Sequence, residues 1–329
     1  MKKLVLLVVI YPLAALLSLR TAAVLVGLPT ISSFFFGAHP VLVVVTLAAG
    51  FAVTSYLVST FTRDYSWVDR LWSTAPVVFA WVYAVRAELA AAPLIAAILV
   101  TVWGTRLTYN FARRGGYTTM EDYRWPILRE RIGNEFLWQL FSLAFISIYQ
   151  ISLFVLFTLP VYRLTTLSGA LSPMTAVLFT VFFLAFLAFE TIADQQQYVF
   201  QNLKHGEVRR DSAPSWFGSS PEEASAALWA DIDRGFLTHG LFRYSRHPNY
   251  FGELAVWWTL YLLAATATAS LLDWSGIGVV LLTLLFFGST AFTESISASR
   301  YPAYSEYQNR TSAIVPWMPG EPVPQQNEA

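Results

Sequence analysis

The sequence contains no cysteine and little charge. Without cysteine, disulfide bonds, thiolate catalysis and cysteine-ligated metal sites are excluded. Only 13% of the 329 residues are charged, whereas a typical soluble domain has about 25%. The net charge at neutral pH is zero, which argues against bulk binding of nucleic acid. The composition therefore points away from soluble enzymes and from nucleic-acid-binding proteins.

Histidine and lysine are also scarce. The four histidines form neither an H-E-x-x-H motif nor another paired spacing, so we expect no metal site. Lysine occurs only at positions 2, 3 and 204, while arginine is plentiful. This bias favours a GC-rich bacterial source and hence a bacterial inner membrane; in a eukaryote we would expect the endoplasmic reticulum.

Hydrophobic residues make up 56% of the chain and are gathered in long apolar runs. A helix needs about 20 apolar residues to cross the hydrocarbon core of a bilayer. We therefore predict an all-α, polytopic transmembrane helical bundle with about eight spans, within a range of seven to nine. The third span is short, and we expect it to be tilted, re-entrant or packed inside the bundle. The predicted spans are 4–28, 40–61, 72–86, 93–111, 136–162, 173–199, 254–272 and 276–292.

The basic residues orient this bundle. With both termini in the cytoplasm, 17 of the 21 arginines and lysines fall in cytoplasmic segments. Only Arg86 and Arg163 fall on the opposite side, and Arg20 and Arg106 lie inside spans. Such an excess of positive charge on one side is typical of cytoplasmic loops. Within these loops, Pro126 is expected to begin a short helix that Gly133 ends, and residues 224–234 are expected to form another.

The densest polar and aromatic cluster is the segment 240–253, GLFRYSRHPNYFGE, which directly precedes the apolar run 254–272. Arginine suits phosphate, and a helix N-terminus adds donors and partial positive charge. We expect Pro248 and Gly252 to interrupt the helix here, so that the chain enters the membrane through a fixed turn. The alternative is a basic turn that holds lipid headgroups.

Acidic residues mark two further places. Glu190 and Asp194 are four residues apart, so they share one helix face near the cytoplasmic end of a predicted span. Carboxylates within a membrane are costly and indicate a functional site, although a salt bridge to Arg106 is the structural alternative. Asp69 precedes the third span and is expected either to face the substrate or to cap that helix or pair with Arg70. All these groups lie toward the predicted cytoplasmic side, which suits a lipophilic substrate and a water-soluble, anionic co-substrate.

Four segments of the chain, in the same order, resemble the steroid 5α-reductase superfamily and look closest to its DUF1295 branch. They are residues 64–73, 110–117, 190–196 and 240–253. The resemblance extends over about residues 60–317. We therefore divide the chain into N-terminal transmembrane helices at 1–60, a steroid 5α-reductase-like (DUF1295) membrane domain at 61–317 and a disordered tail at 318–329.

The resemblance implies an NADPH-dependent oxidoreductase acting on a CH–CH bond. Such an enzyme reduces a double bond conjugated to a ketone in a steroid-like or other lipophilic substrate, and electrostatic stabilisation of the enolate is the expected catalytic effect. The cofactor site is expected on the cytoplasmic side, and the expected partners are the substrate and membrane lipid, with no nucleic acid. The implied cofactor-binding residues are Asp194, Lys204, Arg243, Arg246, His247, Asn249, Tyr250, Glu253, Tyr307 and Arg310. The predicted catalytic residues are Asp69, Arg106 and Glu190.

The chain departs from the family pattern at one position. The tyrosine that polarises the substrate in the family aligns with Trp103, whose indole donates a hydrogen bond but is not an acid. Asp69 is the nearest acidic candidate for the accompanying glutamate. Two alternatives remain: the Arg-His-Pro-x-Tyr-x-Gly pattern at 246–252 also fits S-adenosylmethionine-dependent isoprenylcysteine and phospholipid methyltransferases, and a non-enzymatic lipid-binding protein could retain the fold.

Overall fold

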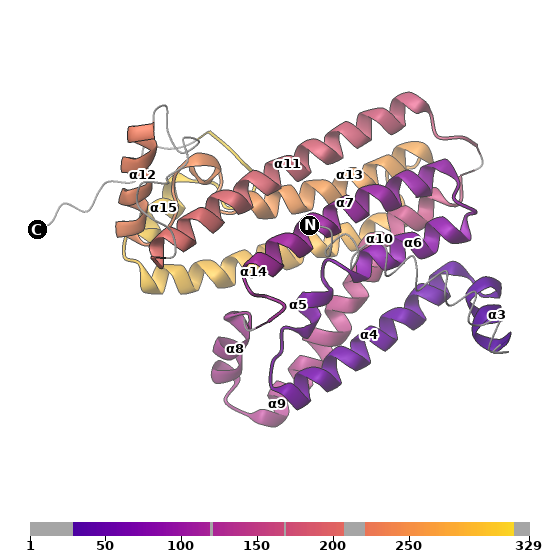
Figure 1. Cartoon of the computed structure of the whole chain (residues 1–329), viewed down its shortest axis with the longest axis horizontal. Helices are drawn as coiled ribbons and strands as arrows, with labels where there is room; N and C mark the ends of the chain where they lie inside the picture. Colours follow the sequence, from indigo (N-terminus) through magenta and orange to yellow (C-terminus); the bar gives the residue numbers. More distant parts are fainter. Residues whose placement is uncertain (1–28, 119–120, 168, 207–220, 319–329) are drawn as a thin grey trace, which may run out of the picture. The chain divides into compact units, whose positions relative to one another are not determined.

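The structure, a computed structural model, describes residues 29–118, 121–167, 169–206 and 221–318. These residues form helices joined by turns and loops, with no β-strand among them (Figure 1). They divide into two compact units. Unit 1 contains the chain up to Val181 together with Trp257–Leu282, and unit 2 contains Phe182–Val256 and the chain from Thr283 onward. Three helices, α11, α13 and α14, contribute residues to both units.

Unit 1 is built mainly from the helices that precede residue 165. In chain order they are α3 (Pro29–Gly37), α4 (Pro40–Thr62), α5 (Trp67–Leu71), α6 (Ala75–Arg86), α7 (Ala91–Arg113), α8 (Arg124–Ile132), α9 (Glu135–Phe141), the π-helix η2 (Ser142–Tyr149) and α10 (Gln150–Leu164), followed later by the 3₁₀ turn η6 (Trp274–Gly276). The core of this unit is aromatic: Trp103, Trp257 and Phe157 are fully buried and their rings are in contact.

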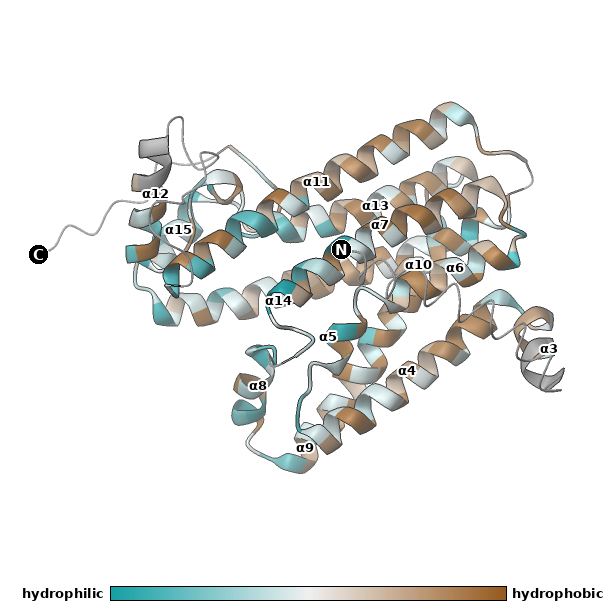
Figure 2. Cartoon of the chain, viewed as in Figure 1, coloured by the Kyte–Doolittle hydropathy of each residue, from teal (hydrophilic) through white to brown (hydrophobic). Residues whose placement is uncertain are grey.

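Unit 2 contains the C-terminal part of α11 (Pro173–Lys204), the first turns of α13 (Pro248–Ala267) and the last turns of α14 (Ile277–Arg300). Three shorter elements complete it: α12 (Pro221–Arg234), the 3₁₀ helix η5 (Gly240–Arg243) and α15 (Tyr304–Arg310). Figure 2 shows that α11 is apolar over most of its length and becomes hydrophilic toward α12. Most of the predicted site residues belong to this unit.

Five helical segments among the described residues are long and apolar enough to cross a membrane: Pro40–Thr62, Ala91–Arg113, Glu135–Leu164, Pro173–Lys204 and Trp274–Arg300. They match five of the predicted spans and confirm a helical protein with the character of a membrane protein. The count of about eight spans stays a prediction.

The other three predicted spans fare differently. The run 4–28 lies outside the described residues. The short run 72–86 forms α6, whose 12 residues reach only about 18 Å. The side chains of α6 are largely buried within unit 1, as one of the three alternatives for this run expected. The run 254–272 lies only in part in α13, because that helix starts earlier, at Pro248, and ends at Ala267.

The two short helices predicted in the basic loops are confirmed. The first is α8, which begins at Arg124, two residues before Pro126. It ends before Gly133, whose φ of 61° lies in the left-handed region. The second is α12, which begins at Pro221 and ends at Arg234.

Candidate functional site

The motif at 240–253 folds as a 3₁₀ turn followed by the first turns of α13. Gly240 has a φ of +64°, and a Cβ there would lie 2.4 Å from the side-chain nitrogen of Gln196 on α11. The next residue, Leu241, donates its backbone N–H to the Gln196 side-chain oxygen at 2.9 Å. Glycine at 240 therefore lets the turn dock on α11 and fixes where α13 begins.

The expectation that Pro248 and Gly252 interrupt a helix is wrong for Gly252. Pro248 is the first residue of α13, where its fixed φ and missing N–H are tolerated, and the helix continues through Gly252. The lack of a side chain serves packing instead. A Cβ on Gly252 would lie 2.5 Å from the Cβ and 2.9 Å from the Cα of Glu190. The two helices of unit 2 can approach this closely only with glycine at this position.

This close approach brings together four polar residues, which we term the carboxylate face: Glu190 and Asp194 on α11, and Asn249 and Glu253 on α13. The three carboxylic residues are buried, at 3%, 5% and 4% exposure in that order. Asn249 donates from its side-chain amide to Asp194 at 3.3 Å. Because ionised carboxylates only accept hydrogen bonds, this face suits a ligand that brings hydroxyl or amide donors, or a cation.

Arg246 and His247 lie beside a third acidic residue, Glu294 on α14. Arg246 makes two hydrogen bonds to the Glu294 carboxylate, at 2.6 and 2.9 Å, and His247 Nε2 lies 3.0 Å from the same carboxylate. Arg246 also donates to the backbone carbonyls of Gln308 and Thr311. The predicted role of Arg246 in cofactor binding stays a prediction, but its donors already have acceptors within the protein.

Glu294 was not identified from the sequence. It is 5% exposed and, besides Arg246 and His247, accepts from the Gln308 side chain at 2.8 Å. Its position in the sequence could have indicated a site, because a carboxylate near the end of a long apolar run needs polar partners. The neighbouring Tyr250 packs its ring on His247 at 5.1 Å and edge-on to Phe286 at 4.8 Å.

The segment after α15 runs along the residues before α13. We term residues 311–317 the C-terminal strap. Its carbonyls at Ser312 and Ala313 accept from the backbone N–H groups of Arg246 and His247, and Trp317 donates to Tyr244 at 3.0 Å. Just before the strap, Tyr307 donates to the carbonyl of Phe242 at 2.5 Å. Burial and the neighbouring Tyr304 raise the pKa of Tyr307 well above its usual value, so the phenol stays protonated.

Lys204 and Arg243 are the other predicted cationic ligands. Lys204 donates to the carbonyl of Gly235 and to the hydroxyl of Tyr301, both at 2.7 Å. Burial acts to raise the pKa of Tyr301, but the hydrogen bonds and charges of Lys204 and Arg300 together outweigh it, so the pKa is lowered. Arg243 is exposed at the end of η5. Arg310 bonds Glu306 at 2.5 Å and retains partial exposure.

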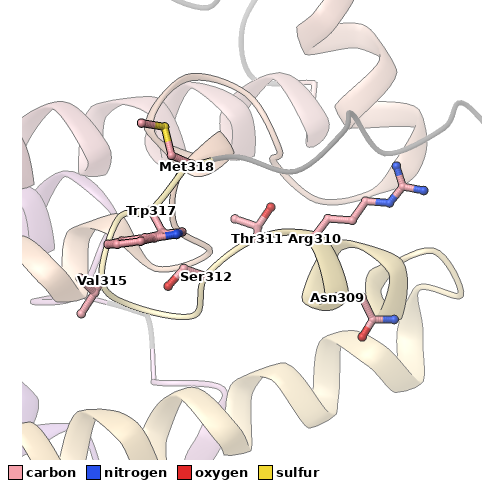
Figure 3. Close-up of a pocket in the computed structure, with 7 residues that line it drawn as sticks. All are labelled: Asn309, Arg310, Thr311, Ser312, Val315, Trp317 and Met318. Atoms are coloured by element: carbon pink, nitrogen blue, oxygen red, sulfur yellow. The ribbon is translucent and has the colours of Figure 1, made fainter.

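Beside the C-terminal strap lies a surface hollow of about 370 Å³ (Figure 3). One side is polar and the other apolar. It is lined by Asn309, Arg310, Thr311, Ser312, Val315, Trp317 and Met318. Of the predicted site residues, only Arg310 lines it.

Asp69 and Arg106 belong to unit 1. Asp69 accepts a hydrogen bond from the Trp125 indole at 2.9 Å, and Arg70 pairs with Asp64 at 2.6 Å rather than with Asp69. Burial and the charge of Asp122 raise the pKa of Asp69 to about 6. Arg106 lies on α7, three residues beyond Trp103. Among the described residues, no three His, Cys, Asp or Glu side chains come together as metal ligands.

Comparisons with known proteins identify a family that the chain resembles. A family model with the description "Protein of unknown function (DUF1295)" matches residues 55–311. An uncharacterized protein of Schizosaccharomyces pombe is 33% identical over 297 residues, which cover 88% of this chain and 83% of the yeast protein. No solved structure matches the chain.

Proposed function

We propose that this chain, which belongs to the DUF1295 family, is an integral-membrane reductase that uses NADPH to reduce a carbon–carbon double bond in a lipophilic enone. The substrate class is a steroid-like or other lipid ketone. Membership of the wider steroid 5α-reductase superfamily, the cytoplasmic position of the site and a bacterial inner membrane form part of the same proposal.

The carboxylate face is the observation that carries the proposal. Three buried carboxylic residues and an amide, on two helices that lie close together, present closely spaced oxygen acceptors to a ligand. Sequence and packing both maintain the arrangement, because Gly252 allows α13 to lie against Glu190 and Asn249 bonds Asp194. Ribose hydroxyls and a carboxamide supply the donors that such a face accepts. The residues present therefore fit the nucleoside part of a dinucleotide.

Unit 2 also supplies cations for the phosphates. Lys204 and Arg243 are the residues we assign to that end, because Arg243 is exposed and the ammonium group of Lys204 carries three N–H donors, two of which have acceptors in the structure. Arg246 holds Glu294 and the C-terminal strap, and we assign it to shaping the site together with His247. Arg310 and Tyr307 remain proposed contacts on the adenosine side.

NADPH, when bound, supplies the hydride that adds to the β carbon of the enone. The protein must then stabilise negative charge on the ketone oxygen and provide one proton to the α carbon. Glu190 is the proposed catalytic residue in unit 2, since a carboxyl group can take up or supply a proton. In unit 1, Asp69 has a pKa of about 6 and can exchange a proton near neutral pH, and Arg106 is a permanent cation.

A methyltransferase is the second candidate, and the carboxylate face is also the observation that favours it. Buried carboxylates would hold the sulfonium cation of S-adenosylmethionine, and the motif at 246–252 fits both families. The cations of unit 2 distinguish the two candidates. NADPH needs several cations around its phosphates, whereas S-adenosylmethionine carries no phosphate.

The reaction type can be tested without knowing the substrate. We would incubate the purified protein with membrane lipid extract and NADPH deuterated at the transferable position, and search the lipids by mass spectrometry. The proposal expects a lipid that gains one deuteron and one proton, and no such product with Asp194→Ala. Transfer of a methyl group from labelled S-adenosylmethionine, with no deuterium incorporation, would contradict it.

A further inference from the structure

The hollow beside the C-terminal strap combines polar and apolar side chains, of which the proposed reductase uses only Arg310. Its polar side consists of Asn309, Arg310, Thr311 and Ser312, which offer a guanidinium, an amide and two hydroxyls. Its apolar side consists of Val315, Trp317 and Met318. Figure 3 shows Arg310 and Asn309 at one end, Trp317 and Met318 at the other, and the two hydroxyl residues between them.

The apolar side chains of the hollow are largely exposed. Trp317 is 73% exposed, Met318 82% and Val315 55%. The strap is nevertheless fixed, because backbone hydrogen bonds join it to Tyr244, Arg246 and His247. Large apolar side chains presented on a fixed segment indicate a surface that meets an apolar phase or partner.

The position of the strap along the chain indicates that this surface meets the membrane. Its hydrogen-bond partners end at His247, directly before α13, and the predicted span 254–272 begins two helical turns further on. Glu294, which bonds Arg246, lies within the last two turns of the candidate span Trp274–Arg300. The strap therefore lies at the level where these helices leave the hydrocarbon. Tryptophan is enriched at this level, and cations there meet anionic lipid headgroups.

We propose that this hollow binds the headgroup of an anionic phospholipid. The phosphate is held by Arg310 and by the hydroxyls of Thr311 and Ser312, and the upper part of the acyl chains packs on Val315, Trp317 and Met318. Arg310 keeps its bond to Glu306 and presents the exposed part of its guanidinium to the lipid. Arg310 is also a proposed contact on the adenosine side of NADPH, whereas the other lining residues have no part in the proposed reductase and none belongs to the carboxylate face.

Brominated lipids, which quench nearby tryptophan, provide the test. The full chain is reconstituted in phosphatidylcholine vesicles that carry brominated phosphatidylglycerol or, at equal content, brominated phosphatidylcholine. The signal of Trp317 is the difference between wild type and Trp317→Phe. We expect stronger quenching by phosphatidylglycerol than by phosphatidylcholine. Arg310→Gln should reduce this preference roughly fivefold, the factor for one cation near an anionic surface.

Arg131→Gln is the matched control, because Arg131 is exposed on α8 and lies outside the hollow. It should leave the preference unchanged. Equal quenching by the two lipids, or a preference that survives in Arg310→Gln, overturns the proposal. Loss of quenching on adding inorganic phosphate or NADPH also overturns it and assigns the hollow to a free anion or a nucleotide. If Arg310→Gln does not fold, the comparison of the two lipids in wild type decides alone.

Discussion

Arg246 shows why a motif residue has to be followed to its hydrogen-bond partners. Its type and position suit a phosphate ligand, yet it makes two bonds to Glu294 and two to backbone carbonyls of the following segment. Removing one partner of a buried ion pair strongly destabilises the folded protein, because the other charge is left buried and unpaired. If an Arg246 variant loses ligand binding, the cause is therefore ambiguous: either Arg246 contacts the ligand, or its removal destabilises the fold.

Asp194 and Asn249 offer a cleaner test of the carboxylate face. We expect Asp194→Ala or Asn249→Ala to weaken NADPH binding by about 1–3 kcal/mol, the cost of one lost polar contact in a buried site. Equilibrium dialysis with the folded variants measures this. Asp233→Ala, an exposed acidic residue on α12, is the control and should bind as wild type does. Normal binding by both site variants would place the cofactor elsewhere.

Asp69 should make stability depend on pH in unit 1. Its folded-state pKa of about 6 lies above the ordinary value of 3.8. The protonated side chain therefore contributes its full stabilisation of the folded state below about pH 3.8. That contribution is lost as the pH rises through 6. Asp69→Asn keeps an oxygen for the Trp125 indole and cannot ionise, so we expect its melting temperature to gain on wild type between about pH 4 and 6. A difference that stays constant over this range would contradict the assignment.

At the scale of single elements, the sequence predicted what composition and local signals determine. Five apolar runs became long helices, and α8 and α12 formed where proline, glycine and charge patterns placed them. The prediction that Gly252 interrupts the helix is wrong because glycine both breaks helices and permits close packing. Which of the two applies depends on Glu190, 62 residues away. The bond from Trp125 to Asp69 and the role of Glu294 likewise arise from distant pairings that no local pattern encodes.

The packing role of Gly252 predicts a specific sensitivity. Gly252→Ala would place a methyl group against the Glu190 backbone, and overpacking of this kind costs about 1–3 kcal/mol. We expect a lower melting temperature and weaker NADPH binding together, because the carboxylate face would widen. Gly50→Ala on α4 is the matched control, since a Cβ there meets nothing within 4 Å. Equal stability of the two variants would show that the helices are not in close contact at Gly252.

At the scale of the whole molecule, charge asymmetry predicts the topology. Seventeen of 21 basic residues fall on the cytoplasmic side only if both termini do. A reporter active only in the cytoplasm should therefore work when fused after Ala329. The same reporter inserted at Gly169, in the turn between α10 and α11, should be silent. Activity at Gly169 and silence at the C-terminus, with both fusions well expressed, would reverse the orientation.

Titration of the purified protein tests most directly whether the site binds NADPH rather than S-adenosylmethionine. The purified protein carries 12 tryptophans whose fluorescence can report binding of either molecule. We predict saturable binding of NADPH that weakens as salt rises, because screening acts on the phosphates, and none of S-adenosylmethionine. Saturable binding of S-adenosylmethionine without NADPH would contradict the account and favour a methyltransferase, and binding of neither would favour a non-enzymatic membrane protein.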